Sequence, residues 1–285
     1  MESPLDALLP AAMAEKAEQV GVTKANLPLH RLVPLGILAG AFIAFGANFS
    51  TVVSAGGGSS PGVTRLLGGV VFSLGLILVV VSGAELFTGN ALIVIAFAGR
   101  KVSAMKLLRN WIVVYVSNFV GAAATAALVV WSGQLRAGDG AIGARAQAIA
   151  EAKGSLGFGQ AVASAVLANC LVCLAVWMTL SARTLVDKVI VIVPPIAAFV
   201  AAGFEHSIAN MYFFPVALFS SPTAPHTATH VTWKHFLVDN LLPVTIGNIV
   251  GGAVLVGLVY WFVYLRGGAP TGATTSALKD IESDR

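Results

Sequence analysis

Apolar residues fill six long stretches of the chain, and shorter polar segments separate them. A helix that crosses the hydrocarbon core of a bilayer needs about 20 predominantly apolar residues, and each stretch reaches that length. The pattern therefore predicts an all-α integral membrane protein with six transmembrane helices. The stretches cover approximately residues 34–54, 66–98, 111–131, 161–180, 189–219 and 241–265.

The second and fifth stretches are too long for one straight span, and each is interrupted. Residues 82–90 read Ser-Gly-Ala-Glu-Leu-Phe-Thr-Gly-Asn, and residues 203–207 read Gly-Phe-Glu-His-Ser. Irregular backbone at membrane depth is tolerated only where it faces packed protein or a cavity. The second and fifth helices are therefore predicted to be broken, and the breaks indicate where a polar pathway would pass.

The two halves of the chain resemble each other at two separate motifs. Each half holds three spans, so the second copy must be inserted upside down relative to the first. Inverted repeats with broken helices are typical of transport proteins whose site lies near the bilayer midplane. The alternative is chance similarity between helices rich in small residues. The matching residues are Gly83, Glu85, Asn110 and Asn118 in the first half, and Gly203, Glu205, Asn240 and Asn248 in the second.

Charge is scarce and unevenly placed. The chain is 57% hydrophobic and 11% charged, against about 25% charged in an average soluble domain. This composition excludes nucleic-acid binders, disordered tails and most soluble enzymes. If the N-terminus is inside, only five of the 17 basic residues fall on the outer side, so the positive-inside rule places both termini in the cytoplasm. These five are Arg65, Arg136, Arg145, Lys153 and Lys234.

Two terminal segments flank the predicted transmembrane domain of residues 33–266. Residues 1–32 contain four acidic residues and no apolar core of a signal peptide. Within them, Pro10 to Val20 predicts a short amphipathic helix with Met13, Ala17 and Val20 on one face and Gly21 as its stop. We expect this helix to lie on the membrane surface or across a pore mouth. Residues 267–285 form a polar tail.

Three ionisable residues fall deep within apolar stretches, where charge is costly and suggests function. Glu85 and Glu205 are predicted to be structural, each accepting hydrogen bonds from backbone N–H groups that its helix break frees. His206 is predicted to line the pore, because imidazole titrates near physiological pH; the alternative is a buried ring satisfied by a backbone carbonyl. Thr88 is best placed to offer a hydroxyl at the first break.

Other candidate motifs predict packing rather than chemistry. Cys170 and Cys173 lie inside an apolar run with no further metal ligands nearby, so we expect small packing residues. His230 and His235 are expected to lie in a solvated loop. No metal or other cofactor is predicted. Two glycine pairs spaced four residues apart predict close approach of helices; they are Gly36 with Gly40 and Gly247 with Gly251.

Four segments resemble signatures of the formate/nitrite transporter family, and the opening run Leu8–Ala14 is similar to its formate channels. The similarity extends from about residue 5 to residue 266. It implies an aquaporin-like protomer with its own pore, assembled into a homopentamer in the bacterial cytoplasmic membrane, with lipid and small anions as its partners and no nucleic acid. The four segments are Val81–Gly89, Ala168–Ala175, Gly203–Asn210 and Pro243–Asn248.

The resemblance also implies roles for individual residues. His206 corresponds to a central pore histidine, with Thr88 beside it and Glu205 behind it. Asn169 and Asn248 correspond to polar residues near that centre, and Lys153 to a basic residue of a vestibule. Two apolar constrictions are implied: an outer one of Phe72, Leu76 and Phe199, and an inner one of Leu86, Phe87 and Val172.

These residues suggest a mechanism and leave alternatives open. A small anion loses its hydration at high cost in an apolar constriction, whereas a neutral weak acid crosses more easily. We therefore expect a pH-dependent formate channel in which His206 protonates the anion transiently or stabilises it. A nitrite or hydrosulfide channel is the nearest alternative. An intramembrane metalloenzyme is disfavoured because His206 lacks a second ligand at helical spacing. A scaffold protein would leave the paired breaks unexplained.

Overall fold

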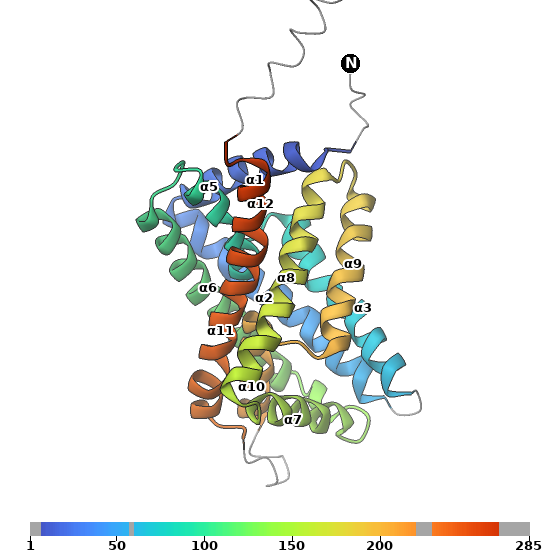
Figure 1. Cartoon of the computed structure of the whole chain (residues 1–285). Helices are drawn as coiled ribbons and strands as arrows, with labels where there is room; N and C mark the ends of the chain where they lie inside the picture. The colour runs from blue at the N-terminus through green and yellow to red at the C-terminus, as the bar shows by residue number, and fades with distance from the viewer. Residues whose placement is uncertain (1–6, 57–59, 221–229, 268–285) are drawn as a thin grey trace, which may run out of the picture.

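A computed structural model of the chain describes residues 7–56, 60–220 and 230–267. Within these residues every regular element is a helix, and six helical segments are long and apolar enough to cross a membrane by length and composition. They form an upright bundle (Figure 1). The predicted all-α fold with six spans is confirmed. The predicted polar tail lies, from residue 268 onward, outside the described residues.

The first half of the chain contributes three spans and a group of short helices. The spans are α2 (Leu29–Ala55), α3 (Pro61–Ser82) and α6 (Ala104–Trp131), and α2 packs along both of the others. Between α3 and α6 the chain turns into the bundle and forms three short helices that contact the second half. These are α4 (Phe87–Asn90), η1 (Ala91–Ile93) and α5 (Val94–Ala98).

The second half repeats this plan. α8 (Phe158–Ser181) packs along α9 (Leu185–Ala202) and against the sixth span, while α10 (Ser207–Ser220) follows the second break and packs against α6. The sixth span runs without interruption from His235 to Tyr264. It includes two π-helical stretches, η4 and η5. Its parts are η4 (His235–Leu241), α11 (Leu242–Ile249), η5 (Val250–Leu258) and α12 (Val259–Tyr264).

Two helices lie across opposite ends of the bundle (Figure 1). α1 (Pro10–Ala25) crosses the end at which α12 finishes, and α7 (Ala141–Gly154) crosses the other end. A single turn, η2 (Gln134–Arg136), precedes α7. The sequence predicted only a polar stretch here. His230, expected to lie in a solvated loop, has a side chain 42% exposed and also hydrogen-bonds through Nδ1 to Glu151 of α7 at 2.6 Å.

The predicted end of the N-terminal helix was wrong. α1 continues through Gly21 to Ala25, because Gly21 lies against Ala96 and Ile93 and acts as a close-packing residue. The predicted face was only partly correct, since Val20 is exposed. The buried stripe instead runs at four-residue spacing through one methionine and three small residues, and α1 packs with it against α5 and η1. Its members are Met13, Ala17, Gly21 and Ala25.

The two predicted breaks have the same local stereochemistry. α3 ends at Gly83 and α9 ends at Gly203, with φ of 72° and 75°, a left-handed conformation that glycine adopts at helix ends without a steric penalty. The next residue donates its N–H back to a carbonyl five positions earlier in both cases, Ala84 to Val79 and Phe204 to Phe199. The chain then runs out of helix for three residues before α4 and α10 begin.

Glycine allows the close helix contacts that the sequence predicted. Gly36 and Gly40 of α2 lie directly against Ser117 and Asn118 of α6. In the second half, Gly251 faces the carbonyl of Val166 on α8, as Gly121 of α6 faces the carbonyl of Ile37 on α2. No side chain would fit at these contacts, so the spans within each half are held at short distance.

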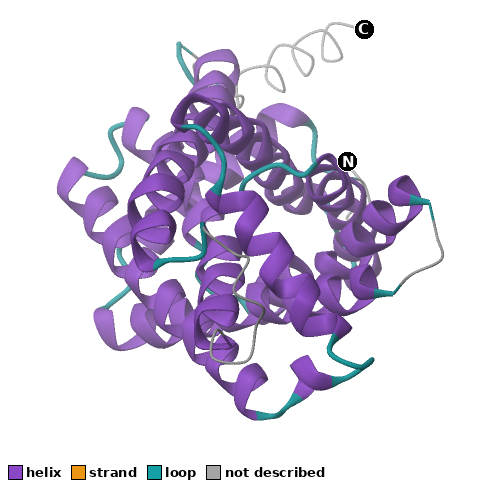
Figure 2. Ribbon diagram, turned by 90° about the horizontal axis from the view of Figure 1, so that it is seen from below, coloured by secondary structure: helices purple, strands orange, loops and turns teal. Residues whose placement is uncertain are grey.

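The outer surface of the bundle is apolar. Seen from the α7 end, the molecule presents only helices and loops in its described part (Figure 2). Large apolar side chains are exposed along the spans, for example Ile112 and Val116 on α6. An apolar surface of this extent needs lipid or another protein subunit to cover it, which agrees with a multi-pass membrane protein.

Candidate functional site

A histidine and a threonine meet where the two helix breaks approach each other. Nε2 of His206 lies 2.9 Å from Oγ1 of Thr88, and both side chains are almost fully buried. Thr88 belongs to α4 in the first half, and His206 immediately precedes α10 in the second. The structure thus brings together two candidate residues that are 118 positions apart in the sequence.

The backbone of α10 fixes the hydrogen-bonding role of the imidazole. The N–H of Ala209 donates to Nδ1 of His206 at 3.1 Å. His206 therefore caps the first turn of α10 with its side chain, as an N-cap residue does. Since Nδ1 accepts, a neutral ring carries its proton on Nε2, directed at the Thr88 hydroxyl. Phe199 stacks on the ring, with centroids 5.8 Å apart.

One asparagine binds the backbone at each helix break, where the following helix begins. Asn248 accepts from the N–H of Ser207 at 2.8 Å and donates to the carbonyls of Glu205 and Ala165. Asn118 makes the equivalent contacts in the first half, accepting from Phe87 N–H and donating to the carbonyls of Glu85 and Gly36. These side chains satisfy backbone groups that the breaks expose. Asn248, predicted to lie near the centre, therefore positions the His206 segment.

Asn169 of α8 connects the two halves of the chain near the histidine. Its amide nitrogen donates to the carbonyls of Thr88 at 3.2 Å and Asn248 at 2.6 Å. Its Oδ1 atom is buried and has no hydrogen-bond partner within the described residues. Cys173, one turn further along α8, also contacts the Thr88 carbonyl through Sγ. Cys170 and Cys173 are free thiols in a helix contact, as predicted.

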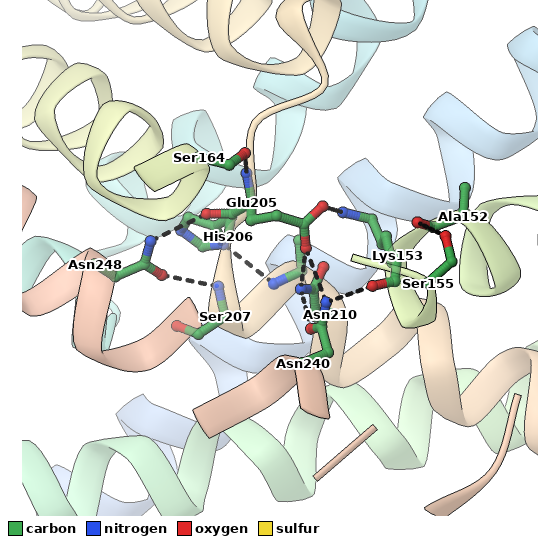
Figure 3. A network of polar contacts seen from close by, with 11 residues as sticks. Ala152, Lys153, Ser155, Ser164, Glu205, His206, Ser207, Asn210, Asn240 and Asn248 are labelled. Carbon is green, nitrogen blue, oxygen red and sulfur yellow. Dashed lines mark hydrogen bonds and ion pairs between the residues drawn. The ribbon is translucent and has the colours of Figure 1, made fainter. Parts of the chain in front are cut away.

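Glu205 lies in a polar network beside the histidine (Figure 3). Its Oε1 atom pairs with Nζ of Lys153 on α7 at 2.8 Å. Its Oε2 atom accepts from the side-chain amides of Asn210 at 2.7 Å and Asn240 at 3.2 Å. Asn240 also donates to the carbonyl of Lys153 at 2.9 Å. The carboxylate thereby ties α7, α10 and the sixth span together.

Glu85 forms the matching network in the first half. Lys24 of α1 pairs with Oε1 at 2.7 Å, and Asn90 donates to Oε2 at 2.7 Å. Asn110 accepts from Asn90 and donates to the carbonyl of Lys24, as Asn240 does with Asn210 and Lys153. The lysine–glutamate pair and the asparagine contacts around it therefore recur in both halves, as the predicted inverted repeat requires.

The expected partners of the two acids were wrong. The carboxylates bind lysine and asparagine side chains, whereas backbone N–H groups at the breaks are bound by Asn118 and Asn248. Lys24, Asn90 and Asn210 were not predicted from the sequence to belong to the site. The repeated spacing of an asparagine five residues after Glu85 and Glu205 was the signal available for two of them.

A cavity of about 380 Å³ opens at the α7 end and leads down to His206. Phe72 and Phe199 line it together with His206, and their rings meet edge to face with centroids 5.6 Å apart. Lys153 and Glu205 also face this α7-end cavity. Leu76, the third residue of the expected outer constriction, is buried and is not among the residues lining the cavity.

The residues of the expected inner constriction do not line the α7-end cavity. Leu86, Phe87 and Val172 are all buried. The Phe87 ring packs edge to face on Tyr115 at 4.8 Å and on Trp111 at 6.2 Å, both on α6. Leu86 and Phe87 directly precede Thr88 in the chain, so buried apolar side chains adjoin the polar centre.

The sequence matches known proteins over most of the chain. Residues 11–262 match the family model described as formate/nitrite transporter. The chain is 46% identical to the formate channel FocA of Escherichia coli strain K12, with 93% of this chain and 97% of the relative covered. It is 41% identical to a probable formate transporter of Methanothermobacter thermautotrophicus, covering 90% and 97% of the two chains.

A solved structure gives the same result in three dimensions. A pentameric formate channel with formate bound superposes with a TM-score of 0.78 at 44% identity, covering 83% of this chain and 98% of that one. The all-helical fold with six apolar spans agrees with both comparisons. The chain therefore belongs to the formate/nitrite transporter family.

Proposed function

We propose that this protein conducts formate and similar small monovalent weak-acid anions across the bacterial cytoplasmic membrane, one pore per protomer of a homopentamer. The observation that carries the proposal is the contact between His206 and Thr88 at the base of the α7-end cavity, directly behind the rings of Phe72 and Phe199. The relatives named as formate channels and the pentameric channel that binds formate support the same substrate and assembly.

The orientation follows from the basic residues. If the positive-inside rule holds, α1 and both termini face the cytoplasm, and the α7-end cavity opens on the outer side. The outer constriction is then formed by Phe72 and Phe199, with Leu76 packed behind them. The inner one is formed by Leu86, Phe87 and Val172. Lys153 stands in the outer vestibule, where its charge is balanced by Glu205.

The central pair offers a hydrogen-bond donor to an anion that has lost its water. Leaving water for an apolar slit is expensive for a carboxylate unless donors replace the hydration shell. An anion that reaches the base of the cavity can replace Thr88 as the partner of the His206 Nε2 proton. The N-terminus of α10 adds its partial positive charge at the same place. The site therefore favours an anion at this position.

Protonation of the anion requires a second proton on the ring. A neutral imidazole that gave up its Nε2 proton would become an imidazolate, which is too basic to form here. The ring must first bind a proton from water at Nδ1, opening its bond to the Ala209 N–H. The imidazolium then transfers its Nε2 proton to the carboxylate, leaving a neutral ring and a neutral acid that can pass the second apolar slit.

Flux into proteoliposomes tests this function. We expect uptake of labelled formate to rise as the external pH falls, because a proton is consumed with each anion. His206→Phe should abolish or redirect this flux. His30→Phe is the matched control, because His30 is exposed at the start of α2. Unchanged pH-dependent formate uptake in the His206→Phe protein would refute the proposed role of His206.

The same vesicles rank the substrates. Formate, nitrite and hydrosulfide supplied at equal concentration separate a formate channel from the nearest alternative within the family. We expect formate to move fastest. Faster flux of nitrite or hydrosulfide would reassign the substrate and leave the pathway in place. Stoichiometric bound metal in the purified protein would instead favour an enzyme.

A further inference from the structure

The wall of the α7-end cavity carries two arginines that the proposed pathway does not use. Arg65 lies in the first turns of α3, and Arg145 lies on α7. Both line the same cavity as Phe72, Phe199 and His206. The lining residues therefore include three cationic side chains, counting Lys153, but Glu205 is the one carboxylate among them.

Within the described residues, no carboxylate pairs with either arginine. Glu205, the one carboxylate of the cavity lining, is already paired with Lys153 at 2.8 Å. Neither Arg65 nor Arg145 forms an ion pair in that part of the chain.

Arg145 is held in place with its charge toward the cavity. Its Nε donates to Oγ of Ser54 on α2 at 3.0 Å, and Ser54 lines the cavity too. Burial lowers the pKa of the Arg145 guanidinium, and the positive charge of Arg65 lowers it further. The two like charges are therefore close enough to repel each other, and an anion between them relieves that repulsion.

We propose that Arg65 and Arg145 form an anion-binding subsite at the outer mouth of the pore, which takes small carboxylates such as formate before they reach the Phe72–Phe199 slit. This inference rests on the proposed function. A guanidinium is positively charged at physiological pH, so the pair attracts carboxylates through its charge. A pair of positive charges in a cavity with apolar walls also raises the local anion concentration at the slit.

The size of the effect follows from Coulomb's law. A guanidinium about 8 Å away in water lowers the energy of a bound anion. At low salt this increases the occupancy of the subsite about twofold. With both arginines, neutralisation should raise the half-saturating external formate concentration about fourfold at ~0.01 M ionic strength and about twofold at ~0.15 M. The increase in the half-saturating formate concentration must therefore become smaller as salt is added. An increase caused by misfolding would not depend on salt in this way.

The test compares formate uptake by wild type and the double variant Arg65→Gln, Arg145→Gln at these two ionic strengths. Vesicles of zwitterionic lipid are used, so that anionic headgroups do not compete for the arginines. Arg136→Gln is the control for net charge, because Arg136 is exposed near α7 and does not line the cavity. Arg65→Lys with Arg145→Lys keeps both charges and should keep most of the low-salt affinity that the glutamine variant loses. Arg136→Gln should stay close to wild type.

Two results would overturn the inference. The first is a double glutamine variant that transports formate with the half-saturating concentration of wild type at low salt. This result would leave the proposed function unaffected. The other is a lysine variant as impaired as the glutamine variant, which would assign the effect to the Arg145–Ser54 contact.

A binding measurement separates the two proposals. Saturation-transfer NMR detects the formate proton on detergent-solubilised protein and needs no flux. If wild type transports no formate but shows an arginine-dependent signal, the proposed function fails and the subsite stands. If it shows neither flux nor signal, both fail.

Discussion

The three lysine–carboxylate pairs within the described residues should differ in strength according to their burial. Lys153–Glu205 is the least exposed, with side chains 15% and 3% accessible, and Lys24–Glu85 follows at 29% and 4%. Lys234–Asp239, at 73% and 34%, is largely in water. We test this by replacing each lysine with Met and each acid with its amide, singly and together, and measuring the free energy of unfolding in a double-mutant cycle.

The expected magnitudes follow from the environment of each pair. Removing one partner of a buried pair leaves a buried charge and costs about 3–5 kcal/mol, whereas an exposed pair contributes about 0.2–1 kcal/mol. We expect a coupling energy of about 2–3 kcal/mol for Lys153–Glu205 and about 1–2 kcal/mol for Lys24–Glu85. For Lys234–Asp239 we expect about 0.5 kcal/mol or less.

Reversible unfolding by SDS in mixed micelles, followed by circular dichroism, gives the required free energies. The cycle at Lys234–Asp239 is the matched control, because it makes the same change of charge outside the network. Equal coupling in all three pairs, or the largest coupling at Lys234–Asp239, would refute the argument that burial sets their strength.

Two further predictions concern glycines. Gly251→Ala should lower the free energy of unfolding by about 1–3 kcal/mol, because the new methyl group meets the Val166 carbonyl, whereas Gly159→Ala, in open space on an exposed turn of α8, should raise it by up to about 1 kcal/mol. Gly203→Ala should lower it by about 1–2 kcal/mol through backbone strain alone, since φ is 75° and nothing lies within 4 Å of the new atom; a neutral result in the same unfolding assay would show that the break tolerates another φ.

The breaks in the second and fifth helices were predictable from sequence because their signal is local. Gly83 and Gly203 each stand two residues before a glutamate within an apolar run. No straight span explains a left-handed glycine followed by a charge at membrane depth. The eight-residue spacing of the two asparagine pairs then gave the repeat, since Asn118 and Asn248 must bind equivalent backbone groups.

The helices at the two ends of the bundle were harder to predict, because small residues form their buried faces. α7 buries Ala146, Ala150 and Gly154, and alanine and glycine at four-residue spacing give almost no amphipathic contrast. For the same reason, the predicted N-terminal helix ended at Gly21, four residues before α1 ends. Lys24 was therefore missed as a partner of Glu85: it lies 61 residues away in the sequence, and only the fold brings the two together.

The two halves of the repeat differ at its centre, and this difference distinguishes a functional role of His206 from a structural one. The repeat that matches Glu85 with Glu205 matches Leu86 with His206, so the same backbone position accepts a leucine in the first half. His206→Leu should therefore cost only about 1 kcal/mol, the value of the cap to Ala209, while formate flux is lost. Asn248→Ala removes bonds to Ser207, Ala165 and Glu205 and should cost about 2–4 kcal/mol. Unfolding and flux measured on both variants decide the point, because a His206→Leu protein as unstable as Asn248→Ala would make the histidine a structural cap.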